Sequence, residues 1–171
     1  MRREKREMPA EWALQVFDKA PYITVSMVDT EYGTPYAVPL SLCRTDEKTF
    51  YFHCAQEGLK LDLLKKNPNV CLSAVTKCAP TVGPLDNSFT LQFKSAIAFG
   101  TASIVADEEE KVYAMRAICQ RFLPKHMAFF DESIQRSLPR TCVVKIVLTA
   151  PPTGKRKEYD AEGKEKTKDN L

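Results

Sequence analysis

Several signals that would assign this sequence of 171 residues to a protein class are missing. It has only two histidines and one tryptophan, and its six cysteines never form a C-x-x-C pair. The usual spacings of zinc ligands are therefore absent, and the sequence predicts no metal site. Neither a P-loop nor a G-x-G-x-x-G sequence is present, and no spacing indicates a Ser–His–Asp triad.

Long apolar runs are also missing. No stretch reaches the roughly 18–20 apolar residues of a membrane-spanning helix, and the charged start MRREKREMPAEW does not match a secretory leader. We therefore expect a cytoplasmic protein with no membrane partner and no disulfide framework. The net charge of +3 is too small to indicate nucleic-acid binding by itself.

The hydrophobic pattern that is present predicts a mainly β domain. Alternating or β-branched stretches predict about six strands, at residues 22–29, 34–44, 49–54, 69–77, 89–107 and 141–150. Helical spacing predicts helices at 9–20, 58–67, 108–122 and 126–137. Short strands with few helices between them indicate an antiparallel barrel or half-barrel with flanking helices. We expect one domain over residues 1–160 and a charged, flexible tail over 161–171.

Two residues inside predicted strands indicate where those strands lie in the sheet. Pro39 has no N–H to donate, so its strand is expected at an edge or a bulge, with main-chain groups left free. Gly100 indicates a bulge or a close approach of another backbone. The stretch 78–88, which holds two prolines and one glycine, is predicted to be a loop.

The stretch FYFHCAQEGLK, residues 50–60, is where a ligand site is expected. A strand ends at His53, and a helix begins after Gly58 with Lys60 in its first turn. A helix N-terminus offers unpaired N–H groups, glycine permits a close approach, and lysine adds a positive charge. These residues suit a phosphorylated, flat, partly apolar ligand. In the plain alternative, Lys60 is a solvated helix charge and His53 a polar residue at a strand end.

Longer segments of the chain resemble the pyridoxamine 5'-phosphate oxidase-like flavoproteins. These segments are AVPLSLC, YFHCAQEGLKLDLLKKNPNVCL, KSAIAFGTA and TGKRK, and the similarity extends from about residue 5 to about residue 160. Within that family the chain is most similar to the nitroimidazole-resistance (Nim) proteins. The resemblance implies an FMN-binding split β-barrel, a homodimer with FMN at the interface, and a small-molecule substrate.

The resemblance also implies, position by position, which residues contact the cofactor. Those along the isoalloxazine ring would be Val38, Pro39, Leu40, Ser41, His53, Cys54 and Ala55. Gly58 and Lys60 would lie at the FMN phosphate, and Ser95 would approach the flavin from the partner chain. Lys155, within a second basic turn formed by TGKRK, would close on the phosphate side.

The implied chemistry is electron transfer through FMN to a small acceptor, with a nitroaromatic such as a 5-nitroimidazole as the candidate. His53 is the candidate catalytic residue, because an imidazole with a pKa near neutrality can donate a proton. Oxidation of pyridoxamine phosphate is not expected, since the arginine that relatives carry near Val38 and one of two cations at the phosphate helix are absent. The alternatives are a flavin reductase acting on another metabolite, and a non-enzymatic flavin- or haem-binding protein.

Overall fold

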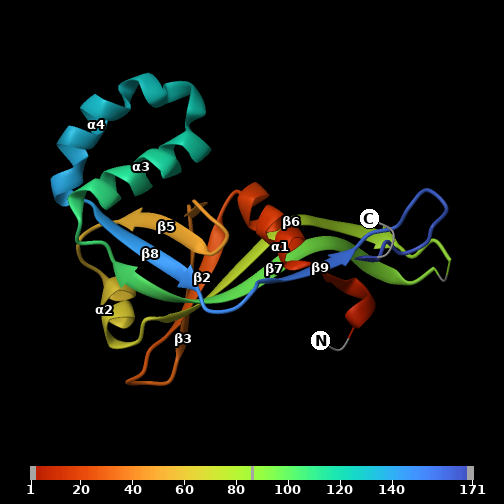
Figure 1. Ribbon diagram of the computed structural model, residues 1–171. Coiled ribbons are helices and arrows are strands. Elements are labelled where there is room, and N and C mark those ends of the chain that lie inside the picture. Colours follow the sequence, from red (N-terminus) through yellow and green to blue (C-terminus); the bar gives the residue numbers. More distant parts are fainter. Residues whose placement is uncertain (1–2, 86, 169–171) are drawn as a thin grey trace.

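The alternating stretches of the sequence form one curved antiparallel sheet with helices around it (Figure 1). The computed structural model describes residues 3–85 and 87–168. The strands are β1 (Glu7–Met8), β2 (Ile23–Val28), β3 (Pro35–Leu40), β4 (Cys43–Arg44), β5 (Thr49–Cys54), β6 (Asn69–Val82), β7 (Phe89–Ile104), β8 (Cys142–Leu148) and β9 (Thr153–Lys157). The helices are α1 (Ala10–Lys19), α2 (Leu59–Lys66), α3 (Glu108–Phe122) and α4 (Phe130–Ser137), with 3₁₀ turns η1 (Glu4–Arg6), η2 (Pro124–Phe129) and η3 (Leu138–Arg140).

The order of the strands explains how the sheet closes into a barrel. The main path is β3-β2-β6-β7-β8-β5-β4, and β9 pairs with β7 and β1. β3 and β4 are at opposite ends of this path, yet only residues 41–42 separate them along the chain. The sheet must therefore curl until its two ends meet. This is the split-barrel fold expected from the resemblance.

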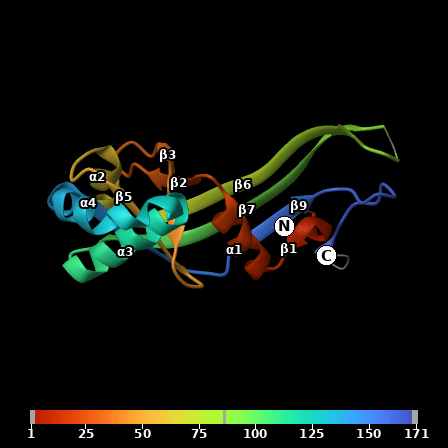
Figure 2. The same cartoon turned by 90° about the horizontal axis from the view of Figure 1, so that it is seen from above.

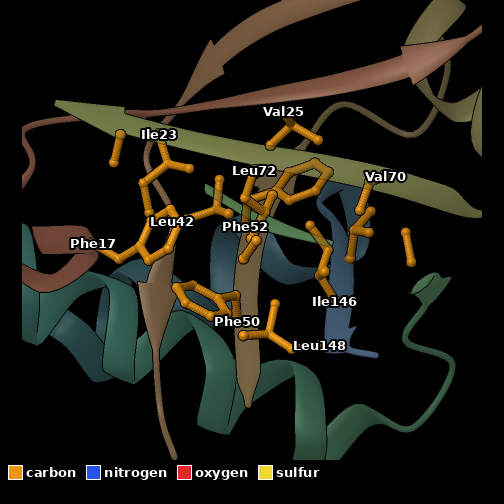
Figure 3. Packing of buried hydrophobic residues seen from close by; sticks show 14 of the residues in the cluster. Phe17, Ile23, Val25, Leu42, Phe50, Phe52, Val70, Leu72, Ile146 and Leu148 are labelled. Atoms are coloured by element: carbon orange, nitrogen blue, oxygen red, sulfur yellow. The ribbon is translucent and has the colours of Figure 1, made fainter. Parts of the chain in front are cut away.

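Apolar side chains fill the inside of the curled sheet (Figure 3). In β2, Ile23, Val25 and Met27 are buried while their neighbours are not, as the period of two along a strand requires. Helix α1 closes this core. Its Phe17 packs edge to face on Phe50 of β5, with ring centroids 5.5 Å apart.

A second apolar cluster lies outside the barrel, under the helical excursion between β7 and β8. Helix α3 begins as predicted, because the Asp107 side chain accepts a hydrogen bond of 2.7 Å from the Glu110 N–H. The Tyr51 hydroxyl of β5 donates to Oε1 of Glu110 over 2.7 Å, which ties the helix to the sheet. Burial and Glu110 together raise the pKa of Tyr51 to about 12.

Beyond the barrel, β6 and β7 continue as a long two-stranded arm, with β9 alongside β7 (Figures 1 and 2). The prediction of a loop over 78–88 is therefore wrong for residues 78–82, which belong to β6. Pairing with β7 over the whole arm outweighs the local signal of Pro80. A register shift between Val75 and Lys77 marks a β-bulge at Thr76.

The segment TGKRK is a strand and not a turn, which raises the number of strands above the expected six. Its Gly154 has no room for a side chain, because a Cβ there would lie 2.7 Å from Cε3 of Trp12. Gly100 marks the close backbone approach that its sequence predicted. A Cβ there would lie 2.8 Å from the Val147 carbonyl oxygen.

The C-terminal segment folds back over the arm. Tyr159 forms an isolated β-bridge with Glu165, and Glu165 makes an ion pair with Arg6. Residues 169–171 of the expected flexible tail lie outside the described residues. The boundary at residue 160 and the flexibility beyond it stay predictions. Within the described part of the chain, no helix is both long and apolar enough to cross a membrane.

Candidate functional site

Strand β3 is an edge strand, as Pro39 predicted. Pro39 is opposite Thr24, and the Asp29 N–H donates to the Thr34 carbonyl at the hairpin end. Because hydrogen-bonded and non-hydrogen-bonded pairs alternate along antiparallel strands, Pro39 falls at a non-hydrogen-bonded pair, where β2 loses no partner. The main-chain groups of Ala37 and the Pro39 carbonyl consequently face the open edge.

The side chains of β3 are divided between the core and the surface. Val38 and Leu40 are half-buried and pack against the barrel core, whereas Pro39 and Ser41 are exposed. A ligand along this edge would therefore meet the Pro39 and Ser41 side chains and the main-chain groups of Ala37 and Pro39, whereas the polar main-chain groups of Val38 and Leu40 face β2. The sequence predicted all four residues without this distinction.

The end of β5 and the start of α2 form the second part of the site. His53, Ala55 and Gly58 are exposed, and Gly58 precedes the helix with a φ of 128°. A Cβ at Gly58 would meet nothing within 4 Å, so the space before the helix is open to a ligand. The N–H groups of Leu59 and Lys60 have no acceptor within the helix and add positive potential there.

At the end of β5, the side chains of His53 and Cys54 are kept neutral beside the positive charge of Lys60. Partial desolvation lowers the pKa of His53 from its ordinary value, so the exposed imidazole is mostly neutral at pH 7. Cys54 is opposite Cys142 in the β5–β8 ladder. Burial, with a smaller contribution from Cys142, raises the pKa of Cys54 to about 11 against the lowering effect of Lys60. Cys54 is therefore a protonated thiol that contributes to a wall and does not act as a nucleophile.

Two residues that sequence reasoning missed support this region. The half-buried guanidinium of Arg121 donates to the carbonyls of Leu42, Phe17 and Ala20 over 2.6, 2.7 and 2.9 Å. It thereby holds the β3–β4 bend against α1. The Gln56 side chain donates to the Pro139 carbonyl over 2.5 Å and anchors the loop before α2. The only sequence signal for Arg121 was a cation near the apolar face of a helix.

The predicted residues do not all come together in one chain. Ser95 and Lys155 are opposite each other in the β7–β9 ladder, on the arm. Figures 1 and 2 both place β9 away from α2 and β5, which lie at the barrel end. Within one chain, the site therefore has two separate parts: the barrel part (38–41, 53–55, 58 and 60) and the arm part (Ser95 and Lys155).

The arm part lies within an exposed apolar face. Ile97 and Phe99 have the same orientation as Ser95 on β7, and they are 47% and 60% exposed. Val75, the cross-strand neighbour of Ser95, is 50% exposed. We call this surface the arm face; its exposed apolar residues are Val75, Val82, Phe89, Leu91, Ile97 and Phe99.

Comparison with known proteins places this arrangement in a family. Residues 9–153 match the family model described as pyridoxamine 5'-phosphate oxidase. No curated protein sequence matches the chain. Among solved structures, a candidate 5-nitroimidazole antibiotic resistance protein from Bacteroides thetaiotaomicron is 25% identical with a TM-score of 0.71, over 85% of this chain and 82% of that one.

Two further structures share the fold at lower identity. A protein from Mycobacterium smegmatis described as FAD and heme binding is 22% identical with a TM-score of 0.77, over 92% of this chain and 77% of that one. A flavocytochrome from Azotobacter vinelandii is 19% identical with a TM-score of 0.71, over 90% and 71%. The family match covers most of the sequence and agrees with the observed split barrel, so the chain belongs to the pyridoxamine 5'-phosphate oxidase-like family.

Proposed function

We propose that the protein is an FMN-dependent oxidoreductase that acts as a homodimer and passes electrons through the flavin to a small acceptor. One observation carries this proposal. The family positions for the cofactor lie in two parts on separate faces of the chain, and the arm part is set in an exposed apolar face. A second copy packed on the arm face would bring its own barrel part to Ser95 and Lys155.

The residues of the barrel part fit FMN. The N–H groups at the start of α2, the open space at Gly58 and the Lys60 cation suit its phosphate. The free edge of β3 offers main-chain donors and acceptors to the polar side of a flat ring. When bound, FMN would supply the electron-transfer chemistry. The protein would bind the cofactor, orient it and limit the access of water.

We assign the proton-donor role to His53. Its pKa is lowered, so the fraction that carries the extra proton at pH 7 is small and increases as the pH falls. An acceptor that takes up electrons also needs protons, and an exposed imidazole at the end of β5 can deliver one from bulk solvent. A nitroaromatic compound is the acceptor we propose, on the strength of the likeness to the Bacteroides protein.

The first experiment is an absorption spectrum of the purified protein after addition of excess FMN and desalting. We expect flavin bands near about 375 and 450 nm to remain with the protein. Lys60→Glu should weaken FMN binding about 10- to 100-fold, because it replaces a charge-assisted contact with repulsion. Lys65→Glu, the same change at an exposed position of α2, should bind FMN normally. Retained flavin in both variants would refute the assignment of Lys60.

The second experiment tests turnover and the role of His53. With reduced FMN bound, a 5-nitroimidazole should reoxidise the flavin, and the rate should rise as the pH falls through the lowered pKa of His53. His53→Ala should bind FMN but react slowly and without this pH dependence. A His53→Ala protein with the wild-type rate would remove the proposed role. Faster reoxidation by another metabolite in a panel would favour the more general flavin reductase.

A flavin- or haem-binding carrier is the second candidate, because a structural relative is described as FAD and heme binding. The apolar cavity next to His126 measures ≈ 170 Å³, which is below the ~300–1,000 Å³ usual for small-molecule sites. The arrangement therefore favours flavin over haem. A Soret band in the isolated protein, or a bound flavin that no acceptor reoxidises, would favour the carrier.

A further inference from the structure

A cavity of ≈ 360 Å³ lies between α1 and the arm, separate from both parts of the candidate flavin site. It falls within the ~300–1,000 Å³ range of small-molecule sites. The polar and aromatic side chains that line it are Trp12, Gln15, Lys19, Thr76, Lys77 and Lys94. None of these residues belongs to the positions that the family resemblance assigns to the flavin.

The backbone explains why lysines line this cavity. Along β6 and β7, Ala74 and Ala96 are buried in the barrel core and are cross-strand partners. The bulge at Thr76 then shifts the register, and the next pair is Lys77 opposite Lys94. The sheet face that forms the core within the barrel therefore becomes cationic where it leaves the barrel.

The charges around the cavity do not balance. Glu158 is buried and accepts from Lys77, Lys94 and Arg156 at N···O distances of 2.7, 3.2 and 2.7 Å. One carboxylate thus faces three cations. Lys19 adds a fourth at the cavity, and it makes no hydrogen bond or ion pair within the described part of the chain.

Solvent screens this excess of positive charge only in part. The side chains of Lys77 and Lys94 are 37% and 36% exposed, so most of each is covered, and both residues line the cavity. Neither carboxylate of α1 lines this cavity, because Asp18 is bound by Arg44 and Glu11 lines a different cavity. A dianion is the ligand charge that this arrangement accommodates best.

An aromatic surface accompanies the positive charge. Trp12 is half-buried, and its indole lies so close to Gly154 that no side chain fits between them. The ring is therefore held in place, and because Trp12 lines the cavity, a ligand can contact it without a large loss of side-chain entropy. Gln15 and Thr76 add an amide and a hydroxyl to the lining.

We propose that this cavity binds a nucleoside monophosphate, with its base on the Trp12 indole and its phosphate among Lys19, Lys77 and Lys94. A stacked base would match the aromatic side chain of the lining, and a dianionic phosphate would match its excess of positive charge. The site is separate from the flavin site, so a ligand can bind here whether or not the protein holds FMN.

Trp12 is the only tryptophan of the chain, so its fluorescence reports directly on this cavity. Titration with AMP should change that fluorescence saturably, and inorganic phosphate should compete at higher concentration. Lys19→Glu should raise the apparent Kd for AMP about tenfold or more, since it replaces an attraction with a repulsion. Lys19 is exposed and makes no bond to another residue that the structure describes, so the variant should fold normally.

Two controls separate this site from the flavin site. Lys65→Glu makes the same charge change at an exposed position of α2 and should bind AMP like the wild type. Lys60→Glu should retain AMP binding even where FMN binding is lost. Trp12→Leu, measured by calorimetry, should bind AMP more weakly. The proposal is refuted if the wild type shows no saturable change, if Lys19→Glu and Lys65→Glu bind alike, or if Lys60→Glu abolishes AMP binding.

Discussion

The barrel and the arm are built from the same two long strands, but they use the faces of those strands differently. In the barrel, one face of these strands is buried: Leu72 of β6 and its cross-strand partner Ala98 of β7 are 0% and 2% exposed. On the arm, one face carries Phe89, which is 93% exposed, and the other carries the ion pairs of Glu158. The barrel therefore holds its own core, whereas the arm depends on charge pairing and on a partner surface.

The largest effect is expected from a matched pair of phenylalanine substitutions. Phe50→Ala removes a buried ring that packs on Phe17, and should lower the free energy of unfolding by about 3–5 kcal/mol. Phe89→Ala, on the arm, removes a side chain that is 93% exposed in the single chain and should lower the stability of the monomer by less than about 1 kcal/mol. Denaturant unfolding measures both. Similar costs for the two variants would show that the arm holds a core of its own.

The arm face supplies the next prediction. Ile97→Asp introduces a charge into the proposed dimer surface. It should weaken the free energy of dimerisation by ~2 kcal/mol or more, which raises the dissociation constant of the dimer by about 30-fold or more. Ile104→Asp is a matched control on the same strand, on the opposite face near the barrel end, where Ile104 is partly exposed. Sedimentation or light scattering measures the mass. A wild-type monomer, or dimers in both variants, would rule out the arm face as the interface.

The other side of the arm predicts a dependence of stability on pH. Burial by itself would raise the pKa of Glu158, but hydrogen bonds from Lys77, Arg156 and Lys94 outweigh it and lower the pKa to about 2. The stabilisation is therefore complete above the ordinary value of 4.5 and decreases as the pH falls toward about 2.

Glu158→Gln tests this pH dependence. The variant should lose about 1–3 kcal/mol of stability at pH 7, and its stability should change less than that of the wild type between pH 5 and about 2. Unfolding is measured across that range, with Glu47→Gln, at an exposed position, as the control. A Glu158→Gln protein that loses stability with acid exactly as the wild type does would show that other carboxylates dominate.

The smallest effect is expected at the barrel surface. Lys66 of α2 makes an ion pair of 3.0 Å with Glu31, and both side chains are more than half exposed. Water screens such pairs, so Lys66→Ala should leave the free energy of unfolding close to that of the wild type. A small effect here and a larger effect of Glu158→Gln would show that ion pairs stabilise the arm more than the barrel surface. A loss of stability as large as that of Glu158→Gln would indicate that the pair fixes α2 against the β2–β3 turn.

Much of the barrel could be predicted because its signals are local. The alternation in residues 22–29 led directly to β2, the cap at Asp107 led to α3, and the proline at position 39 led to an edge strand. β9 could not be predicted in this way. Its charged sequence, TGKRK, has no apolar alternation, and it becomes a strand because β7 and β1 pair with it on either side.

The same division holds for the candidate site. The sequence by itself determined which groups stand together where β5 ends and α2 begins, because His53, Gly58 and Lys60 are close along the chain. Only the tertiary structure decided that Ser95 and Lys155 lie apart from them, and that Lys77, Lys94 and Trp12 line one cavity. The physical reason is the range of the interactions. Local backbone preferences specify a strand end and a helix start, whereas register, a bulge and barrel closure depend on contacts between distant segments.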